Sequence, residues 1–384
     1  MIPPPDVLAA RLERARVLPG SLQLDALVVT HLPNVFYLTG FAGSAGTVVL
    51  SGTGLSILVD GRYRAALADR GFDSHDGPRV RVVPPAGGSA EESLLAMLAE
   101  AGHRRVGFEA AHLSVARHQA LERLISSKSA LELLPTEGLV ESLRLRKDPY
   151  EQGTLREAGR RLSAIMQGVL ADLRPGMREW DVAARLEAGL RRAGFARSAF
   201  DTIVASGANS AMPHHRAAER CLTPRDLVVL DFGGVYNGYC VDLSRTVSIG
   251  EPTAEAVQLH TAVSSAQAAA IAAVRPGARA SDVDRAARDV LTEHGLGDAF
   301  THGTGHGLGL EVHEAPRLGP LRTTGAEPTR DSTEILDAGM VVTIEPGAYL
   351  AGSGGVRIED DVLVTSNGCE VLTTAGRELM VVDC

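Results

Sequence analysis

Residues 227–242 read Leu-Val-Val-Leu-Asp-Phe-Gly-Gly-Val-Tyr-Asn-Gly-Tyr-Cys-Val-Asp, and this stretch decides the fold of the second half of the chain. Two apolar runs flank Asn237-Gly238, a dipeptide that is typical of the tight turn of a β-hairpin. We therefore predict a hairpin with one acidic residue on each arm, Asp231 on the first and Asp242 on the second. Taken alone, this pattern is as compatible with ordinary hairpin acids as with a functional site.

A second pair of acids repeats this arrangement further along the chain. Glu345 and Glu359 lie on either side of residues 353–355, Ser-Gly-Gly, which we expect to form the turn of a second hairpin. Four carboxylates that converge without a cation would repel one another strongly. His306, in the segment His-Gly-Thr-Gly-His-Gly-Leu-Gly of residues 302–309, adds an imidazole to these acids.

The expected ligands of a metal centre are Asp231, Asp242, His306, Glu345 and Glu359. Carboxylates with one imidazole suit divalent ions of the Mn, Co or Zn type rather than thiophilic ions. Carboxylates can also bridge two cations roughly 3.5–4 Å apart, a spacing at which a water is activated and a carbonyl group is polarised. The sequence therefore predicts a two-metal site.

An internal repeat relates the two hairpins. Residues 174–182 recur as residues 275–283 at an offset of 101, with six of nine positions identical. A long Ala-rich helical stretch precedes each copy, and a second helical pattern follows it. Each half also carries a histidine in a matching position, His214 in the first and His313 in the second. We therefore expect two similar halves, each of which delivers one histidine and two acids to a shared centre.

The first part of the chain has a different pattern. Short runs rich in Val and Leu predict strands at residues 25–32, 46–51, 56–60, 80–84 and 105–109. Ser89 opens a capping box at the start of a helix, and Pro149 suits the first turn of another helix, which follows a domain boundary. We predict an α/β domain over residues 1–145 and a second domain over residues 146–384.

Composition narrows the classes of function. The formal net charge is −9 and no basic stripe is visible, which argues against a nucleic-acid partner. No uncharged apolar run reaches about 18 residues, so no membrane span is expected. The first residues lack a signal-peptide pattern and the four cysteines include no CxxC pair, so we expect a cytoplasmic protein. Neither a phosphate-binding loop nor a Gly-x-Ser-x-Gly nucleophile motif is present.

Together these motifs resemble those of the pita-bread metallopeptidases. The acidic hairpin, the segment 302–309, Glu-Pro-Gly at 345–347 and Arg-Ile-Glu-Asp-Asp at 357–361 are similar to motifs of the Xaa-Pro branch, which contains prolidase (Xaa-Pro dipeptidase) and aminopeptidase P. Asn-Val-Phe-Tyr-Leu-Thr-Gly-Phe at residues 34–41 resembles the N-terminal domain of that branch. The resemblance implies an α/β creatinase-like domain followed by an α+β pita-bread catalytic domain with an internal pseudo-two-fold repeat.

The resemblance also implies roles for the metal ligands. Asp231 would bind one divalent ion, and His306 and Glu345 would bind the other. Asp242 and Glu359 would bridge the two ions, for which Mn is favoured over Co or Zn. Glu345 resembles the general base of the family, which takes a proton from the bridging water.

Other residues would act on the substrate. By resemblance, His214 and His313 would hold the substrate carbonyl and the tetrahedral intermediate, and His302 would line the proline pocket. Arg357 resembles a residue that supports a metal-bound carboxylate beside the substrate. A dipeptidase must also bind a free carboxylate directly after proline, and Arg317 is the candidate for this. Arg322 and Arg330 lie in the same segment, and the pattern is as compatible with three exposed loop charges.

Two features depart from the family pattern. Ser244 stands where members often have Thr, and the segment 319–333 is longer than in compact prolidases, so we expect a lid or a specificity loop there. The resemblance favours an Xaa-Pro dipeptidase that acts as a homodimer on proline-containing dipeptides. The alternative is aminopeptidase P, which acts on longer peptides. A pita-bread domain that binds peptides without cleaving them is a further alternative, although all five ligands are present.

Overall fold

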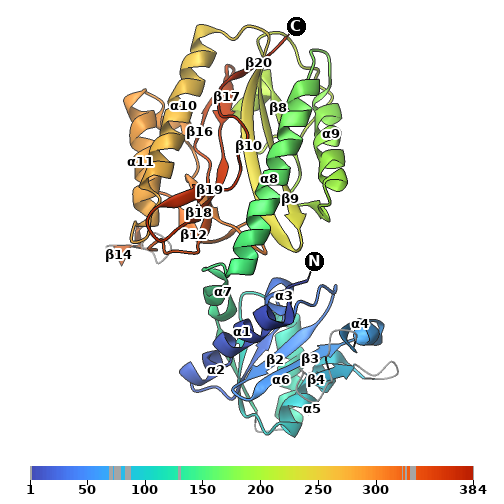
Figure 1. The fold of residues 1–384 in the computed structure, drawn as a ribbon. Helices are drawn as coiled ribbons and strands as arrows, with labels where there is room; N and C mark the ends of the chain where they lie inside the picture. Colours follow the sequence, from blue (N-terminus) through green and yellow to red (C-terminus); the bar gives the residue numbers. More distant parts are fainter. Residues whose placement is uncertain are drawn as a thin grey trace. The chain divides into compact units, whose positions relative to one another are not determined.

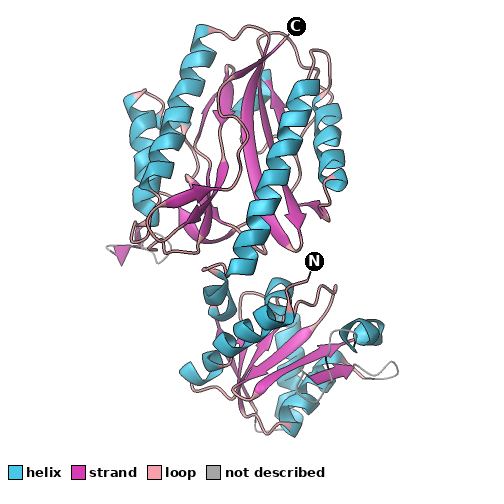
Figure 2. Cartoon of the chain, viewed as in Figure 1, coloured by secondary structure: helices cyan, strands magenta, loops and turns pink. Residues whose placement is uncertain are grey.

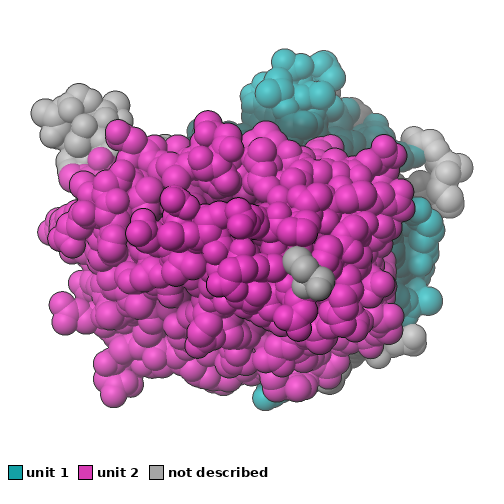
Figure 3. Space-filling model, turned by 90° about the horizontal axis from the view of Figure 1, so that it is seen from above, with its two compact units in different colours: residues 1–144 teal, residues 145–384 magenta. Residues whose placement is uncertain are grey.

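The computed structural model describes residues 2–68, 72, 79–82, 88–128, 131–321, 323–324, 327–328 and 334–383. The chain forms two compact units, Met1–Arg144 and Leu145–Cys384, which Figure 3 colours separately. The predicted boundary, between residues 145 and 146, lies one residue after the boundary between these units. Most of the segment 319–333, for which we expected a lid or a specificity loop, lies outside the described residues.

The described part of unit 1 is built around a six-stranded mixed sheet with the order β4-β3-β2-β1-β5-β6. Its strands are β1 (Ala26–Val29), β2 (Thr47–Ser51), β3 (Gly54–Val59), β4 (Arg79–Val82), β5 (Arg105–Glu109) and β6 (Glu132–Thr136). Its helices are α1 (Pro5–Ala15), α2 (Val17–Ser21), α3 (Leu32–Thr39), α4 (Arg64–Ala68), α5 (Ala90–Glu100), α6 (Val115–Lys128) and α7 (Leu139–Arg144). Strands β1, β2 and β3 pair antiparallel, whereas the outer pairs are parallel. This is the α/β architecture that the sequence predicted.

Local sequence signals explain several elements of unit 1. Ser89 and Glu92 form the predicted capping box, in which the side chain of each accepts a hydrogen bond from the backbone N–H of the other. Strand β6 was not expected from the sequence, and its Pro135 is tolerated because β6 lies at the edge of the sheet. Of the predicted strand 80–84, residues 83 and 84 lie outside the described residues.

Among its described residues, unit 2 has four long helices, which are α8 (Pro149–Asp172), α9 (Glu179–Arg192), α10 (Ala254–Ala273) and α11 (Ala280–Glu293). One sheet contains β7 (Arg197–Ser198), β8 (Ile203–Ser206), β9 (Leu227–Tyr236), β10 (Tyr239–Ile249) and β20 (Met380–Val382). A second sheet contains β11 (Gly305–Gly307), β12 (Glu314–Leu318), β15 (Val341–Ile344), β18 (Asp360–Val364) and β19 (Cys369–Val371). Two short pairs are formed by β13 (Thr323–Thr324) with β14 (Glu327–Pro328), and by β16 (Gly347–Leu350) with β17 (Gly354–Arg357). In the described part of the chain, no helix has both the length and the apolar composition that a membrane span requires.

The internal repeat is visible in the backbone of unit 2. The helix pairs α8–α9 and α10–α11 flank the strands from two sides (Figures 1 and 2). The same backbone contact closes the junction within each pair. The N–H of Gly176 donates to the oxygen of Leu222 (2.8 Å), and the N–H of Gly277 donates to the oxygen of Leu336 (2.9 Å). Because positions 176 and 277 differ by 101, this contact follows the sequence repeat.

The hairpin predicted from residues 227–242 forms between β9 and β10. Tyr236 pairs with Tyr239, and the turn residues Asn237 and Gly238 have φ angles of 51° and 91°. A two-residue turn with both φ angles positive matches the right-handed twist of the strands and favours Asn-Gly. Both strands are buried over nearly their whole length, so the acids on them lie inside the unit.

The second hairpin differs from the prediction. Strand β15 pairs with β18 and β16 pairs with β17, so Glu345 and Glu359 lie where the chain passes from one pair to the other. The turn is formed by residues 351–353, and the predicted turn is therefore wrong by two residues. A Cβ atom on Gly355 would lie 2.2 Å from the backbone oxygen of Ser210. Close packing within strand β17, rather than a turn, therefore explains this glycine.

Candidate active site

The residues that the sequence singled out line one cavity of about 910 Å³ in unit 2. Its walls come from both halves of the repeat. The expected metal ligands and substrate-binding residues that line it are Asp231, Asp242, His306, Glu345, Glu359, His214, His302, His313, Arg317 and Arg357. The fold thus brings acids and histidines from positions as distant as 214 and 359 into one space.

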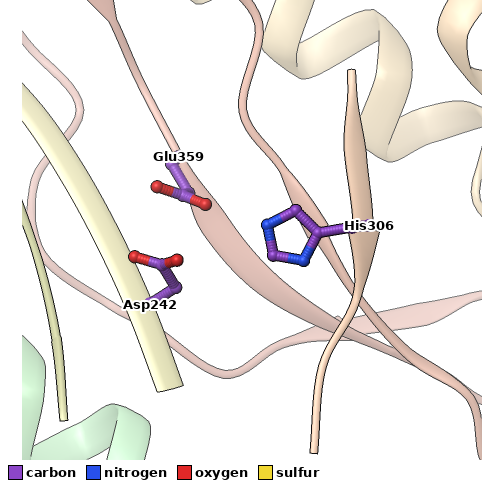
Figure 4. A group of neighbouring side chains, drawn as sticks. All are labelled: Asp242, His306 and Glu359. Carbon is purple, nitrogen blue, oxygen red and sulfur yellow. The ribbon is translucent and has the colours of Figure 1, made fainter. Parts of the chain in front are cut away.

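Three of the expected ligands form a tight group. One ligand atom from each of Asp242, His306 and Glu359 lies within 4.8 Å of the others, and Figure 4 shows the three side chains pointing toward one another. Asp242 comes from β10, His306 from β11, and Glu359 from the position before β18. A cation between them would have carboxylate oxygens and an imidazole nitrogen as ligands.

Asp231 and Glu345 lie beside this group but do not belong to it. Oε1 of Glu345 is 3.4 Å from Nε2 of His306. Oδ2 of Asp231 accepts a hydrogen bond from Nη2 of Arg357 (2.5 Å), whereas Oδ1 of Asp231 is buried and has no hydrogen-bond partner among the described residues. A buried acceptor without a partner is costly, so Oδ1 of Asp231 is an atom that a cation would satisfy.

The carboxyl groups of the site raise one another's pKa. Burial raises the pKa of Asp242 well above its usual range, and the charge of Asp231 raises it further. Burial also raises the pKa of Glu359 well above its usual range, with Asp242 as the next cause. Burial raises the pKa of Glu345 to about 8, although Arg357 opposes this shift. A divalent cation would offset the repulsion and hold these groups as carboxylates.

His306 is suited to bind a cation as a neutral imidazole. Its pKa is lowered to about 4, first by burial and next by His313, whose ring centroid lies 4.3 Å away. Nδ1 of His306 is 3.0 Å from the oxygen of Gly307, and a carbonyl oxygen can only accept, so Nδ1 carries the proton. Nε2 then carries a free lone pair, which faces the acids. The donor set of the cavity therefore fits a divalent cation.

Side chains behind the ligands fix their positions. The hydroxyl of Ser244 donates to Oε2 of Glu359 (2.6 Å) and accepts from Nε of Arg357 (3.1 Å). The departure from Thr at this position therefore keeps the hydroxyl that contacts the ligand. The backbone N–H of Asp242 donates to Oδ2 of Asp361 (3.0 Å), which anchors the strand that carries Asp242.

Tyr349 was not expected from the sequence, yet it connects two of the expected residues. Its hydroxyl accepts from Nη1 of Arg357 (2.8 Å) and lies 3.0 Å from Nε2 of His302. Nη1 of Arg357 also donates to the backbone oxygen of Pro213 (3.3 Å). A single guanidinium group therefore contacts the carboxylate of Asp231, a loop of the cavity wall and the tyrosine that holds His302.

Three expected substrate residues have exposed side chains in the cavity. His214, His313 and Arg317 line it and are open to solvent. Arg317 on β12 stands opposite His306 on β11. Partial burial of its ring against the cavity wall lowers the pKa of His313, and the charge of Arg317 lowers it further, which favours the neutral imidazole. These side chains are placed to contact a bound molecule.

Comparisons with known proteins identify the family. A model of metallopeptidase family M24 matches residues 153–366, and a model of the creatinase/prolidase N-terminal domain matches residues 11–146. The chain therefore belongs to metallopeptidase family M24. This confirms the predicted fold class and the predicted class of enzyme, and membership implies a divalent metal ion and a peptide substrate.

Three similar proteins illustrate the relationship. An uncharacterised peptidase of Bacillus subtilis is 38% identical over 373 residues, which cover 97% of this chain and 99% of that protein. The structure of an Xaa-Pro dipeptidase from Bacillus anthracis has a TM-score of 0.89 at 36% identity and covers 98% of this chain and 100% of its own. The structure of an X-Pro aminopeptidase from Thermotoga maritima has a TM-score of 0.84 at 32% identity and covers 96% of this chain and 100% of its own.

Proposed function

We propose that the protein hydrolyses the peptide bond between an N-terminal residue and proline, as an Xaa-Pro dipeptidase. The observation that carries the proposal is the convergence of Asp242, His306 and Glu359 within 4.8 Å, in a cavity that His214 and His313 also line. The similarity to an Xaa-Pro dipeptidase over 98% of the chain supports the choice of bond.

We propose that two divalent ions, Mn in preference to Co or Zn, occupy this site. Asp231 would hold one ion, His306 and Glu345 would hold the other, and Asp242 and Glu359 would bridge them. When bound, such a pair of ions lowers the pKa of water and polarises a carbonyl group. The raised pKa values of the acids and the unpartnered oxygen of Asp231 support this assignment.

Different side chains would then transfer the proton and stabilise the developing negative charge. Glu345 accepts a proton from the attacking water and delivers it to the leaving proline nitrogen. His214 and His313 donate hydrogen bonds to the carbonyl oxygen as negative charge develops on it. His302, held by the hydroxyl of Tyr349, lies beside the proline ring.

Arg317 supports the preference for dipeptides. It lines the cavity, and among the described residues no carboxylate forms an ion pair with its guanidinium group. A free carboxylate directly after proline would supply that partner. The alternative, aminopeptidase P, is favoured by the similarity to the X-Pro aminopeptidase. The cavity volume of about 910 Å³ is near the upper end of the roughly 300–1,000 Å³ range of small-ligand sites, which leaves room for residues after proline.

Hydrolysis of Ala-Pro, Ala-Pro-Ala and Ala-Ala by Mn-loaded protein tests the proposal. We expect kcat/KM to be highest for Ala-Pro and negligible for Ala-Ala. Faster cleavage of Ala-Pro-Ala would assign the protein as aminopeptidase P. Preferential cleavage of Ala-Ala, or no cleavage of any of the three peptides, would refute an Xaa-Pro peptidase of either kind.

The homodimer and the cytoplasmic location that the sequence led us to expect are also proposals. The family resemblance supports the dimer, and light scattering at micromolar concentration would measure it. A fully active monomer would contradict that proposal.

A further inference from the structure

Glu179, the first residue of α9, is a buried carboxylate that organises the wall of the cavity. Its side chain is 0% exposed. Oε1 accepts hydrogen bonds from the N–H (2.8 Å) and the hydroxyl (2.6 Å) of Ser206 and from Nδ2 of Asn209 (3.0 Å). Oε2 accepts from Nε2 of His215 (2.8 Å) and from the N–H of Ala218 (3.0 Å). Both oxygens are therefore occupied, and every one of these donors belongs to residues 206–218.

His214 lies between two anchors of this loop. Before it, the oxygen of Pro213 accepts from Nη1 of Arg357. After it, His215 binds Glu179. The ring of His214 lines the cavity, and none of the described residues makes a hydrogen bond to it. The direction of His214 therefore follows from the backbone that the two anchors hold.

The other half of the repeat contains a related contact at a different position, in which the carboxylate of Asp284 also pairs with Arg288 (3.0 Å). Asp284 on α11 is 1% exposed and accepts from both the N–H and the hydroxyl of Thr304, each at 3.0 Å. Thr304 precedes His306 by two positions. The second helix of each half thus uses a buried carboxylate to hold a Ser or Thr at the base of a histidine-bearing segment. Glu179 and Asp284 therefore each fix a segment that carries a histidine of the cavity wall, His214 and His306 respectively.

We propose that Glu179 is a positioning residue that aims His214 at the carbonyl group of the substrate. The inference rests on the proposed function, in which His214 binds that carbonyl. Burial of Glu179 by itself would raise the pKa of the carboxyl group, but hydrogen bonds from Ser206, Asn209 and His215 outweigh burial and lower the pKa. The group is therefore an ionised carboxylate at neutral pH, with both oxygens able to accept.

Glu179→Gln would disturb this arrangement in a defined way. One oxygen becomes an NH₂ group, which cannot accept a hydrogen bond. In either amide orientation the NH₂ group faces a backbone N–H, that of Ser206 or that of Ala218, and neither can reverse its role. The loop must shift to relieve this contact. A displacement of about 1 Å near reacting groups can lower a rate roughly 100-fold.

A double-mutant cycle on the Mn-loaded protein tests the inference with Ala-Pro as substrate. Glu179→Gln should lower kcat roughly 10- to 100-fold with little change in KM, and His214→Ala should lower kcat roughly 10²–10³-fold. If Glu179 acts through His214, the double variant should match His214→Ala within about threefold. Losses that multiply would overturn the inference and assign Glu179 to general stability. Absence of Ala-Pro and Ala-Pro-Ala hydrolysis in the wild type would refute the proposed function instead.

Two further variants keep the test decisive if Glu179→Gln folds poorly. His215→Phe removes one donor from the loop while Glu179 stays ionised, and it should lower kcat. His215→Gln can restore a donor near the position of Nε2 and should recover most of the loss. Equal kcat values for the two variants would overturn the inference.

Asp284→Asn is the matched control for loss of a buried carboxylate. It should weaken binding of Mn, measured by calorimetry, because Asp284 holds Thr304, two positions before His306. Its effect on kcat should multiply with that of His214→Ala. Glu179→Gln should leave the affinity for Mn within about twofold of wild type. A large loss of Mn affinity in Glu179→Gln would contradict a role confined to His214.

Discussion

Replacing Glu345 by Gln should raise the stability of the metal-free protein and lower the catalytic rate of the Mn-loaded protein. In the metal-free protein, burial raises the pKa of Glu345 from 4.5 to about 8. A group whose pKa is raised by folding contributes stability below its unfolded pKa, and that contribution is lost as the pH rises toward its folded pKa. Between pH 4.5 and pH 7 the folded protein keeps a proton that the unfolded chain releases. This lowers the free energy of unfolding by on the order of 3 kcal/mol.

Glu345→Gln removes the titrating group, so the metal-free variant should not show this loss. At pH 7 it should unfold roughly 6–12 °C above metal-free wild type, because a domain of this size shifts by about 2–4 °C per kcal/mol. The difference should shrink toward pH 4.5. Catalysis should change in the opposite sense, with kcat for Ala-Pro roughly 10²–10⁴-fold lower in the Mn-loaded variant, since an amide cannot accept the proton of water.

Thermal unfolding of chelator-treated protein, followed by circular dichroism from pH 4.5 to pH 8, measures the first effect. Glu293→Gln is the matched control, because Glu293 at the end of α11 is exposed and does not line the cavity, and it should behave as wild type. The same pH dependence in Glu345→Gln as in wild type would refute the electrostatic argument. A near-normal kcat in a variant that binds Mn would remove Glu345 from the role of base.

Three further predictions concern the metal and the substrate. Chelation should abolish hydrolysis of Ala-Pro, and added Mn or Co should restore it; undiminished activity after chelation, with metal content measured by mass spectrometry, would contradict the metal mechanism. His214→Ala and His313→Ala should each lower kcat roughly 10²–10³-fold if they stabilise the oxyanion, whereas unchanged rates would make both residues structural. Arg317→Ala should raise KM for Ala-Pro more than for Ala-Pro-Ala, and an equal change for both peptides would show that Arg317 does not bind the dipeptide carboxylate.

The parts of the fold that depend on local sequence were predicted well. Asn237-Gly238 fixes a two-residue turn whatever surrounds it, so β9 and β10 form where the sequence placed them. The internal repeat could also be recognised in the sequence, because Arg-Pro-Gly follows the end of a helix in both halves. These signals were sufficient to anticipate that distant acids and histidines would share one space, although they gave no distances between them.

The parts that depend on contacts between distant residues were not predicted. Gly355 resembles a turn residue in sequence, but its lack of a side chain is required by the backbone of Ser210. Tyr349 meets His302 across 47 positions, and Glu179 meets its partners across 27 to 39 positions. No local motif encodes such contacts, because they arise only when segments far apart in the sequence pack together.

A titration of the metal-stripped protein with Mn, followed by the rate of Ala-Pro hydrolysis, tests the central claim most directly. The account predicts no activity without metal and a rate that rises until two equivalents of Mn are bound per chain. Full activity without metal, saturation with no hydrolysis of Ala-Pro, or complete activation by one equivalent would contradict a two-metal Xaa-Pro peptidase.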